Sequence, residues 1–385
     1  MSVSCKSNML PNVRVIRVSL VLFIACAASS AQAGEQERNY FLKDTAVGTE
    51  AGFNPFTVML NSGFDILRNG SYQNQLHKID YATGARNIFN NAISFNENIK
   101  LSGGWNEFIA HEVFPYKEFN LSHGHFVPNY FLHVLGEGML YRKLGEWYRK
   151  HEYPYPRLLA LGTIFAAQYL NESVENGGYV GANTDPIADL VFFNPLGWLL
   201  FSFDEVARFF SEDISLGFWP GQPSIDLSTF SLYNAGESYF FRGGFEAMGS
   251  FKFFAYIGAE GVGGLSWKFN ETDSLSVAGG YRMIWLRQEG DEYHRRVTPV
   301  EPGNWLASVF WDRDDSLLAS VKYGVGGDPT LRVNLYPGFV DMKPFHVGAF
   351  FWASEREGLI GGVNFSFSPV GLAVQSGGDQ SRAVF

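Results

Sequence analysis

The C-terminal half of the chain alternates apolar and polar residues with a period of two, and this pattern restricts the fold more than any other feature. From about Leu227 to Phe367, roughly ten segments of eight to fourteen residues are separated by turn-like clusters such as Asn270-Glu271-Thr272-Asp273 and Asp312-Arg313-Asp314-Asp315. The alternation is clearest at 274–288, 316–325 and 330–336. It predicts antiparallel strands with one apolar face and one polar face.

Charged residues lie in the middle of these segments, opposite the apolar face. The polar set includes Arg242, Glu246, Lys252, Lys268, Arg282, Lys322, Arg332 and His346, and the tryptophans near segment ends are Trp267, Trp285, Trp305, Trp311 and Trp352. A soluble β-sandwich also alternates, but its inner face packs on a second sheet and rarely carries mid-strand charges. A transmembrane antiparallel β-barrel combines a polar lumen with a lipid-facing apolar band, so the pattern favours a closed barrel of about ten to twelve strands.

The first residues have the layout of a secretion signal. Lys6, Arg14 and Arg17 precede or flank an apolar run at 18–28, and Ala31-Gln32-Ala33 is a small-x-small cleavage site. We therefore expect residues 1–33 to be removed, with cleavage before Cys26 as a lipoprotein as the alternative. Together with the predicted barrel, the signal indicates the outer membrane of a Gram-negative bacterium.

Charge and cysteine content exclude several classes of partner. Both cysteines, Cys5 and Cys26, lie in the predicted signal, so a disulfide framework or a thiolate metal site is not expected in the mature chain. Removal of three cations and no acids takes the net charge from −10 to −13 (−10 − 3). This charge argues against a nucleic-acid partner. The expected partners are outer-membrane lipids or lipopolysaccharide, and the barrel-assembly machinery, which reads C-terminal aromatics such as Phe385.

The remaining segments differ in kind. Residues 34–121 are mixed and contain one or two candidate barrel strands, the clearest at 92–101, whereas 122–212 are predicted to be a helical insert with helices at about 124–150, 157–176 and 186–210. The barrel is expected at 213–368, followed by a tail at 369–385. Because the helices are strongly apolar, we expect the insert to fill the lumen, cap one mouth or lie on the membrane face.

A polar stripe on the first helix provides the candidate site. His125, Asn129, His133, Glu137 and Tyr141 are spaced by four, which places them on one face of an α-helix. The following helices add further acids and an amide: Glu172, Glu175, Asp185, Asp189 and Asn194.

Four interpretations of the stripe stay open. It is a buried hydrogen-bond network, or a divalent-metal site built from a histidine, Glu137 and Glu172, with Glu175 or Asp189 as alternatives to Glu172. It is a general acid/base site, with catalytic candidates His125, His133, Glu137, Glu172 and Asp189 and with Ser122 or Ser173 as the available nucleophile. Otherwise the stripe lines a path for a substrate or for protons.

Part of this region resembles a known family. The runs Asn129-Tyr130-x-x-His133-x-x-x-Glu137-Gly138, Glu172-x-x-Glu175 and Asp185-Pro186-x-x-Asp189-x-x-x-x-Asn194 are similar to motifs of the DUF3943 type, an uncharacterised family of Gram-negative envelope proteins. The resemblance covers roughly 120–200 and departs from the family at Val134 and at Asp185-Pro186. It implies an envelope location and an architecture, and no chemistry.

These features lead to a ranked prediction of function. The first is a barrel with a helical plug that has a structural or ligand-binding role at the outer membrane. The alternative is a membrane-embedded hydrolase of lipid or lipopolysaccharide, and the third is a selective transport channel. A divalent metal is the one cofactor expected.

Overall fold

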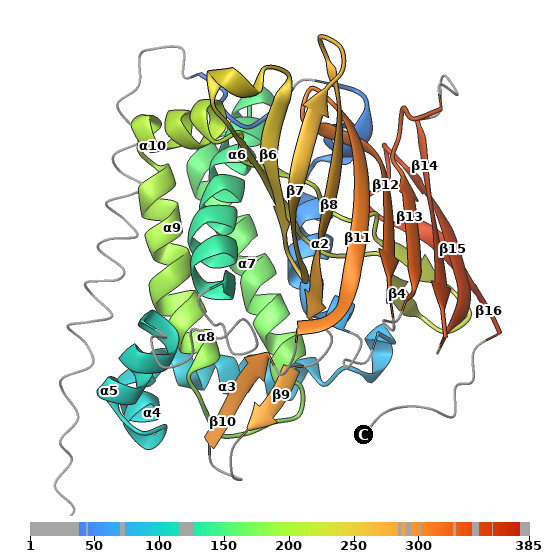
Figure 1. The fold of residues 1–385 in the computed structure, drawn as a ribbon. Coiled ribbons are helices and arrows are strands. Elements are labelled where there is room, and N and C mark those ends of the chain that lie inside the picture. The colour runs from blue at the N-terminus through green and yellow to red at the C-terminus, as the bar shows by residue number, and fades with distance from the viewer. Residues whose placement is uncertain are drawn as a thin grey trace, which may run out of the picture.

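The computed structural model describes residues 38–43, 45–69, 74–114, 127–283, 286–289, 294–299, 302–325, 329–340, 346–355 and 357–377. Its architecture is mainly β with several helices. One large sheet occupies one side of the molecule, and helices α6, α7 and α9 lie beside the part of the sheet that contains β6 (Figure 1).

The large sheet contains thirteen strands in the order β2-β5-β6-β7-β8-β11-β12-β13-β14-β15-β16-β3-β4. Neighbouring strands are antiparallel except for the parallel pair β16 and β3. The strands are β2 (Gly217–Phe218), β3 (Ser224–Asp226), β4 (Ser231–Tyr233), β5 (Tyr239–Gly243), β6 (Phe251–Ile257), β7 (Glu260–Lys268), β8 (Asp273–Met283), β11 (Pro302–Arg313), β12 (Ser316–Gly324), β13 (Leu331–Leu335), β14 (Val347–Ser354), β15 (Gly358–Phe365) and β16 (Gly371–Ser376).

The prediction of a closed barrel of ten to twelve strands is wrong, because the sheet has thirteen strands and its end strands β2 and β4 do not pair. One continuous segment of the chain nevertheless contacts strands at both ends of the sheet. Strands β2 and β3 are parts of one run, 217–226, which pairs with β5 and β4 on one side and with β16 on the other. Pro220 and Pro223 lie within this run and donate no backbone hydrogen bond, which accounts for its division into two short strands.

The two faces of the sheet differ in polarity, as the sequence predicts. In β8, Ser274, Ser276 and Arg282 are buried while Val277 is 56 % exposed. In β12, Ser320 and Lys322 are buried while Val321 and Tyr323 are exposed. The alternation at 274–282 and 316–325 therefore produces strands with polar residues on the buried face and apolar residues on the exposed face.

The predicted charged set divides into two groups. Arg242, Arg282, Lys322 and Arg332 are buried, whereas Glu246, Lys252 and Lys268 are exposed and His346 is half-buried. The buried face also carries an aromatic and aliphatic cluster that includes Trp219, Phe240, Phe254, Tyr256 and Phe310. The side chains that cover this face are therefore a mixture of large rings and paired charges.

A second, three-stranded sheet lies below the helices. It joins β1 (Ala182–Asn183) to β10 (His294–Pro299) in parallel and β10 to β9 (Leu286–Glu289) in antiparallel orientation (Figure 1). The segment between β8 and β11 thus leaves the large sheet and contacts the helical part of the chain.

The helices include short 3-10 and π-helical elements. They are η2 (Gly48–Gly52), α2 (Pro55–Gly63), η3 (Asp65–Asn69), η4 (Leu76–Lys78), α3 (Tyr81–Ile93), α4 (Phe95–Leu101), α5 (Trp105–Phe108), η5 (Ile109–Val113), η7 (Val127–Gly136), α6 (Glu137–Lys150), α7 (Pro156–Asn176), α8 (Asp185–Ile187), η8 (Ala188–Phe193), α9 (Asn194–Phe201), α10 (Asp204–Arg208), η9 (Phe209–Asp213) and η10 (Glu246–Met248). In the core between helices and sheet, Met139, Leu144 and Ile164 pack with Phe218 and Tyr239.

The three predicted helices are confirmed in the described residues, and the third is interrupted after Phe201. The predicted strand at 92–101 is wrong, because this segment forms the end of α3 and then α4. The predicted tail at 369–385 contains β16, so the sheet extends beyond residue 368. The helices pack beside the sheet, with α2, α3 and α7 packed together.

In the described part of the chain, no single helix has the length and apolar composition of a membrane span. One bent pair, Asp185–Phe201 with Asp204–Asp213, meets these two criteria together, with an angle of 87° at the break.

Candidate functional site

The predicted stripe does not form a single line of contacts. His133 lies in η7, a π-helix, and Glu137 begins α6. Hydrogen bonds in a π-helix join residues five apart, so residues four apart no longer lie directly above one another. His133 and Glu137 consequently contact different parts of the molecule.

His133 contacts the helix that follows α8. Its Nδ1 lies 3.0 Å from Asn194 Oδ1, and its Nε2 lies 3.4 Å from Asp189 Oδ2. Burial lowers the pKa of His133 to about 4, so the imidazole is neutral at pH 7. With Nδ1–H donating to Asn194 Oδ1, Nε2 carries the lone pair and faces the Asp189 carboxyl group.

Close approach of two helices brings these residues together. A Cβ on Gly197 would lie 2.5 Å from Val134 O and 2.9 Å from His133 O. A side chain at position 197 would therefore separate α9 from η7, and Asn194 would lose contact with His133.

Glu172, Glu175 and Asp185 form an acidic cluster next to Asp189. One carboxylate oxygen from each of the three lies within 4.8 Å of the corresponding oxygens of the other two. The pKa of Asp189 is well above its usual value, first because the group is buried and then because of the negative charges of Asp185, Glu172, Glu112 and Glu175. Four acids of the helical part thus lie within electrostatic reach of Asp189.

Glu112 and its neighbours were not identified from the sequence. Thr184 Oγ1 donates to Glu112 Oε1 at 3.2 Å, and Asn129 Nδ2 donates to Glu112 O at 2.8 Å. Glu112 lies in η5, within the segment 34–121 for which the sequence predicted one or two barrel strands. To identify Glu112 as a candidate, the sequence analysis would have had to assign this segment as helical.

Glu137 faces the sheet and does not contact His133. Its Oε1 accepts from Gln168 Nε2 at 2.5 Å and from the Tyr239 hydroxyl at 3.4 Å. Burial raises the pKa of Glu137 well above its usual value, and the negative charge of the neighbouring Glu237 raises it further. In the described residues, the partners of His133 are Asn194 and Asp189.

The other predicted residues are located as follows. Tyr141 is buried in the core between helices and sheet. His125 and Ser122 lie outside the described residues. The Ser173 hydroxyl donates to Tyr169 O at 2.6 Å, so this serine is not activated by His133. In the described ranges, His133 has no serine partner, and the histidine–serine pair of a hydrolase is not found there.

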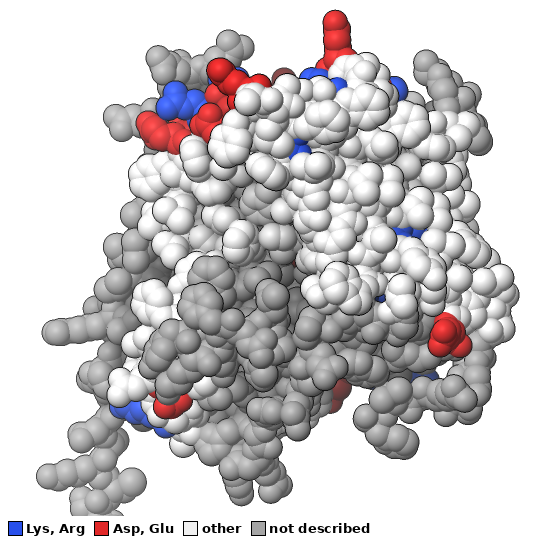
Figure 2. All heavy atoms as spheres, viewed as in Figure 1, with Lys and Arg blue, Asp and Glu red and all other residues white. Residues whose placement is uncertain are grey.

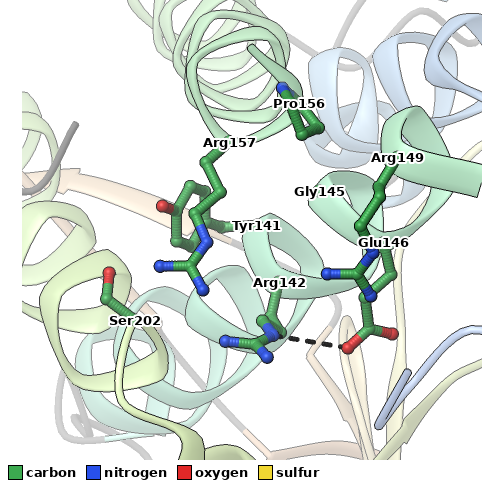
Figure 3. A pocket seen from close by; sticks show the side chains of 8 residues that line it. All are labelled: Tyr141, Arg142, Gly145, Glu146, Arg149, Pro156, Arg157 and Ser202. Atoms are coloured by element: carbon green, nitrogen blue, oxygen red, sulfur yellow. Dashed lines mark hydrogen bonds and ion pairs between the residues drawn. The ribbon is translucent and has the colours of Figure 1, made fainter. Parts of the chain in front are cut away.

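A small pocket beside α6 and the start of α7 is lined by three arginines and one acid, Glu146, together with Tyr141 and Ser202 (Figure 3). Arg142 contacts Glu146 at 3.4 Å and Asp204 at 2.7 Å. Glu146 accepts the backbone N–H groups of Tyr40, Phe41 and Leu42 at 2.8–2.9 Å. These bonds fix the N-terminal segment against α6, which is a structural role.

Comparison with known proteins gives no relative. No family model matches the chain, and no curated protein and no solved structure matches it significantly. The resemblance to the DUF3943 type therefore stays a prediction.

Proposed function

We propose that this chain is a Gram-negative outer-membrane protein that is embedded through the exposed face of its large sheet and binds a ligand through its helical part. The proposal rests on one observation, the inverted polarity of the sheet. Leu265, Val277 and Val309 are exposed on adjacent strands, while charged residues lie on the buried face. Soluble domains normally bury apolar residues and leave charges in water. The reverse arrangement suits a sheet whose outer face contacts lipid.

The distribution of charge on the surface supports the same proposal. Over the large sheet, the face seen in Figure 2 carries few charged residues, and acidic and basic residues gather near its two ends. The rings of Phe251 and Trp267 stack with their centroids 6.2 Å apart, near one end of their strands. Trp305, near the start of β11 and the opposite end of the strands, is 64 % exposed. Aromatic residues near strand ends are typical of the membrane–water interface.

The hydrogen bonding of the sheet edges is also compatible with lipid. Unpaired backbone groups are costly in a bilayer. The run 217–226 bonds to neighbours on both sides: Trp219 N donates to Ser238 O at 2.8 Å, and Gly371 N donates to Pro223 O at 2.8 Å. This run therefore satisfies backbone groups of both β5 and β16.

The covered inner face favours a structural or ligand-binding role over an open pore. The ring centroid of Trp219 lies 4.2 Å from that of Phe240 and 5.6 Å from that of Phe310. The carboxylates of the helical part then provide the ligand-binding groups, and a divalent metal is the ligand class that suits oxygen donors. Hydrolysis of lipid and selective transport stay alternative predictions, and none of the described contacts favours them.

Detergent dependence tests the proposal. We expect the folded protein to leave membranes only with detergent, to migrate differently on a gel before and after boiling, and to show strand with a helical minority by circular dichroism. The physical reason is that water does not solvate the exposed apolar face. A folded protein that stays monomeric in buffer without detergent would contradict lipid embedding and favour a soluble sheet.

A further inference from the structure

Helices α7 and α9 each belong to a long segment without charged residues. In α7 no charge occurs between Arg157 and Glu172, and across η8 and α9 none occurs between Asp189 and Asp204. The charges that bound each segment are 15 positions apart (172 − 157 and 204 − 189). At a rise of about 1.5 Å per residue, the α7 segment is about 22 Å long. This length is close to the apolar band of about 25 Å that transmembrane barrels present to lipid.

The charged ends of the two segments lie together at both ends. Arg157, at the start of α7, and Ser202, just after α9, line the same small pocket (Figure 3). At the opposite ends, Glu172 lies within electrostatic reach of Asp189. The two charge-free segments run in opposite directions along the chain, and their ends coincide.

The two helices also meet halfway along these segments, where the ring centroids of Phe165 and Trp198 are 6.5 Å apart. The segments are therefore in register over their length. Their exposed residues are all apolar: in α7 they are Leu158, Leu159, Gly162, Phe165 and Ala166, and around α9 they are Leu196 and Phe203.

The hydroxyl groups within the segments bond to the protein itself. The Thr163 and Ser202 hydroxyls donate to the backbone carbonyl four residues earlier, at 2.9 Å and 2.7 Å. The Tyr169 hydroxyl donates to Ala85 O at 2.6 Å. Hydrocarbon offers no hydrogen-bond partner, so polar groups of a helix in lipid must be satisfied in this way. None of these hydroxyls needs water as an acceptor.

One end of the paired segments combines exposed tyrosines with charges. Tyr153 and Tyr155, just before α7, are 49 % and 77 % exposed. Beyond α9, Asp204, Glu205 and Arg208 of α10 are exposed, and charged side chains gather at this end of the molecule (Figure 2). Aromatic rings next to charged groups are typical of the membrane–water interface.

We propose that the outer faces of α7 and α9 contact the acyl chains of membrane lipids, so that both helices extend the lipid-facing surface of the large sheet. The inference rests on the proposed function and adds the helices to the embedded surface. Helix α6 joins the two parts, since Met139 and Leu144 pack with residues of α7, of α9 and of the sheet. The helices run in roughly the same direction as the neighbouring strands (Figure 1).

Lipid suits these faces better than a protein partner does. Protein interfaces carry about one hydrogen bond per 100–200 Å², and the exposed residues of the two segments offer no side-chain donor or acceptor. An acyl chain requires neither.

The accessibility of a nitroxide spin label tests the proposal on the full chain in vesicles of phosphatidylethanolamine and phosphatidylglycerol. With Cys5 and Cys26 replaced by Ser, the label is attached at Ala166→Cys or at Leu196→Cys, both exposed and in the middle of the segments. Collisions with oxygen, which dissolves in lipid, should be frequent at both positions, and collisions with a water-soluble nickel complex should be rare. The control Glu205→Cys, on the exposed face of α10, should show the reverse. Frequent nickel collisions at 166 and 196 would overturn the proposal.

The same labels distinguish lipid from a second copy of the chain. If α7 and α9 pack against another chain, collisions with both reagents should become rare and the labels of two chains should broaden each other's spectra. That result would also overturn the proposal.

A label at Val277→Cys, on the exposed face of the sheet, separates this inference from the proposed function. Lipid contact at 277 together with water at 166 and 196 would leave the embedded sheet intact and remove the helices from the bilayer. Water at all three positions would contradict the proposed function itself.

Discussion

Replacement of Glu260 by Gln is expected to lower the free energy of unfolding by about 3–5 kcal/mol. Glu260 in β7 is 1 % exposed and is the partner of two cations on the buried face of the sheet. It forms an ion pair with Lys322 Nζ, and its Oε1 accepts from Arg332 Nη1 at 2.8 Å. Without the carboxylate, both buried cations lose this counter-charge, whereas Lys322 keeps its hydrogen bond to Tyr256 and Arg332 keeps its position over the Trp352 ring.

Urea unfolding in detergent or lipid vesicles measures this loss. Glu246→Gln is the matched control, because Glu246 is exposed in η10 and its replacement should change stability by less than about 0.5 kcal/mol. The double variant Glu260→Gln/Lys322→Met should recover part of the loss, since it removes one of the uncompensated charges. A loss below about 1 kcal/mol in Glu260→Gln would mean that water reaches this face and screens the cations.

Replacement of Val277 by Arg should cost about 2–4 kcal/mol if the exposed face of the sheet lies in the middle of a bilayer. Val277 is in the middle of β8, opposite Leu265 of β7 and Val309 of β11. All three are exposed apolar residues, so an arginine here would enter an apolar row three strands wide. In water the same substitution at an exposed position would cost little.

The control for this experiment is Glu271→Arg, at the exposed turn before β8. Near the membrane surface an arginine costs only about 0–1 kcal/mol, so the two variants should differ clearly when both are unfolded from lipid vesicles. Equal and small losses at both positions would show that Val277 faces water.

The strands could be predicted because their period is unambiguous over long segments. The alternation at 316–325 and 330–336 corresponds to β12 and β13, and the predicted segment 274–288 covers most of β8 but extends into β9 of the second sheet. At 92–101 the same reasoning failed. Phe95 and Ile99 are four residues apart, which also suits a helix, and in a short segment packing decides between the two periods. In the structure Ile99 is fully buried against Phe108 and Ile187.

The strand order at the two ends of the sheet depends on pairings that no local pattern encodes. The pairing of β16 with β3 joins residues about 147 positions apart (371 − 224) and is parallel, whereas hairpin reasoning links strands that are neighbours in sequence. The short strands of the run 217–226 also lack a long alternating pattern. Strand number and closure were therefore predicted wrongly, although the faces of the strands were predicted correctly.

The sequence identified His133, Asp189 and Asn194 as candidates, and in the structure His133 contacts both Asp189 and Asn194. Residues spaced by four form a straight stripe only on an α-helix. Because η7 is a π-helix, the side chains of the predicted stripe point in different directions. Glu112 and Glu237 contact the site from distant parts of the chain, so spacing within the helices could not identify them.

The central claim is that the exposed face of the large sheet contacts lipid, and fluorescence quenching tests it most directly. A chain with Cys5 and Cys26 replaced by Ser is labelled at Val277→Cys, or at Glu271→Cys, with an environment-sensitive fluorophore and placed in vesicles. Lipids with a spin label halfway along the acyl chain should strongly quench the probe at position 277 and leave the probe at 271 nearly unaffected. Strong quenching of the 277 probe by an aqueous quencher, with none by the lipids, would contradict the account.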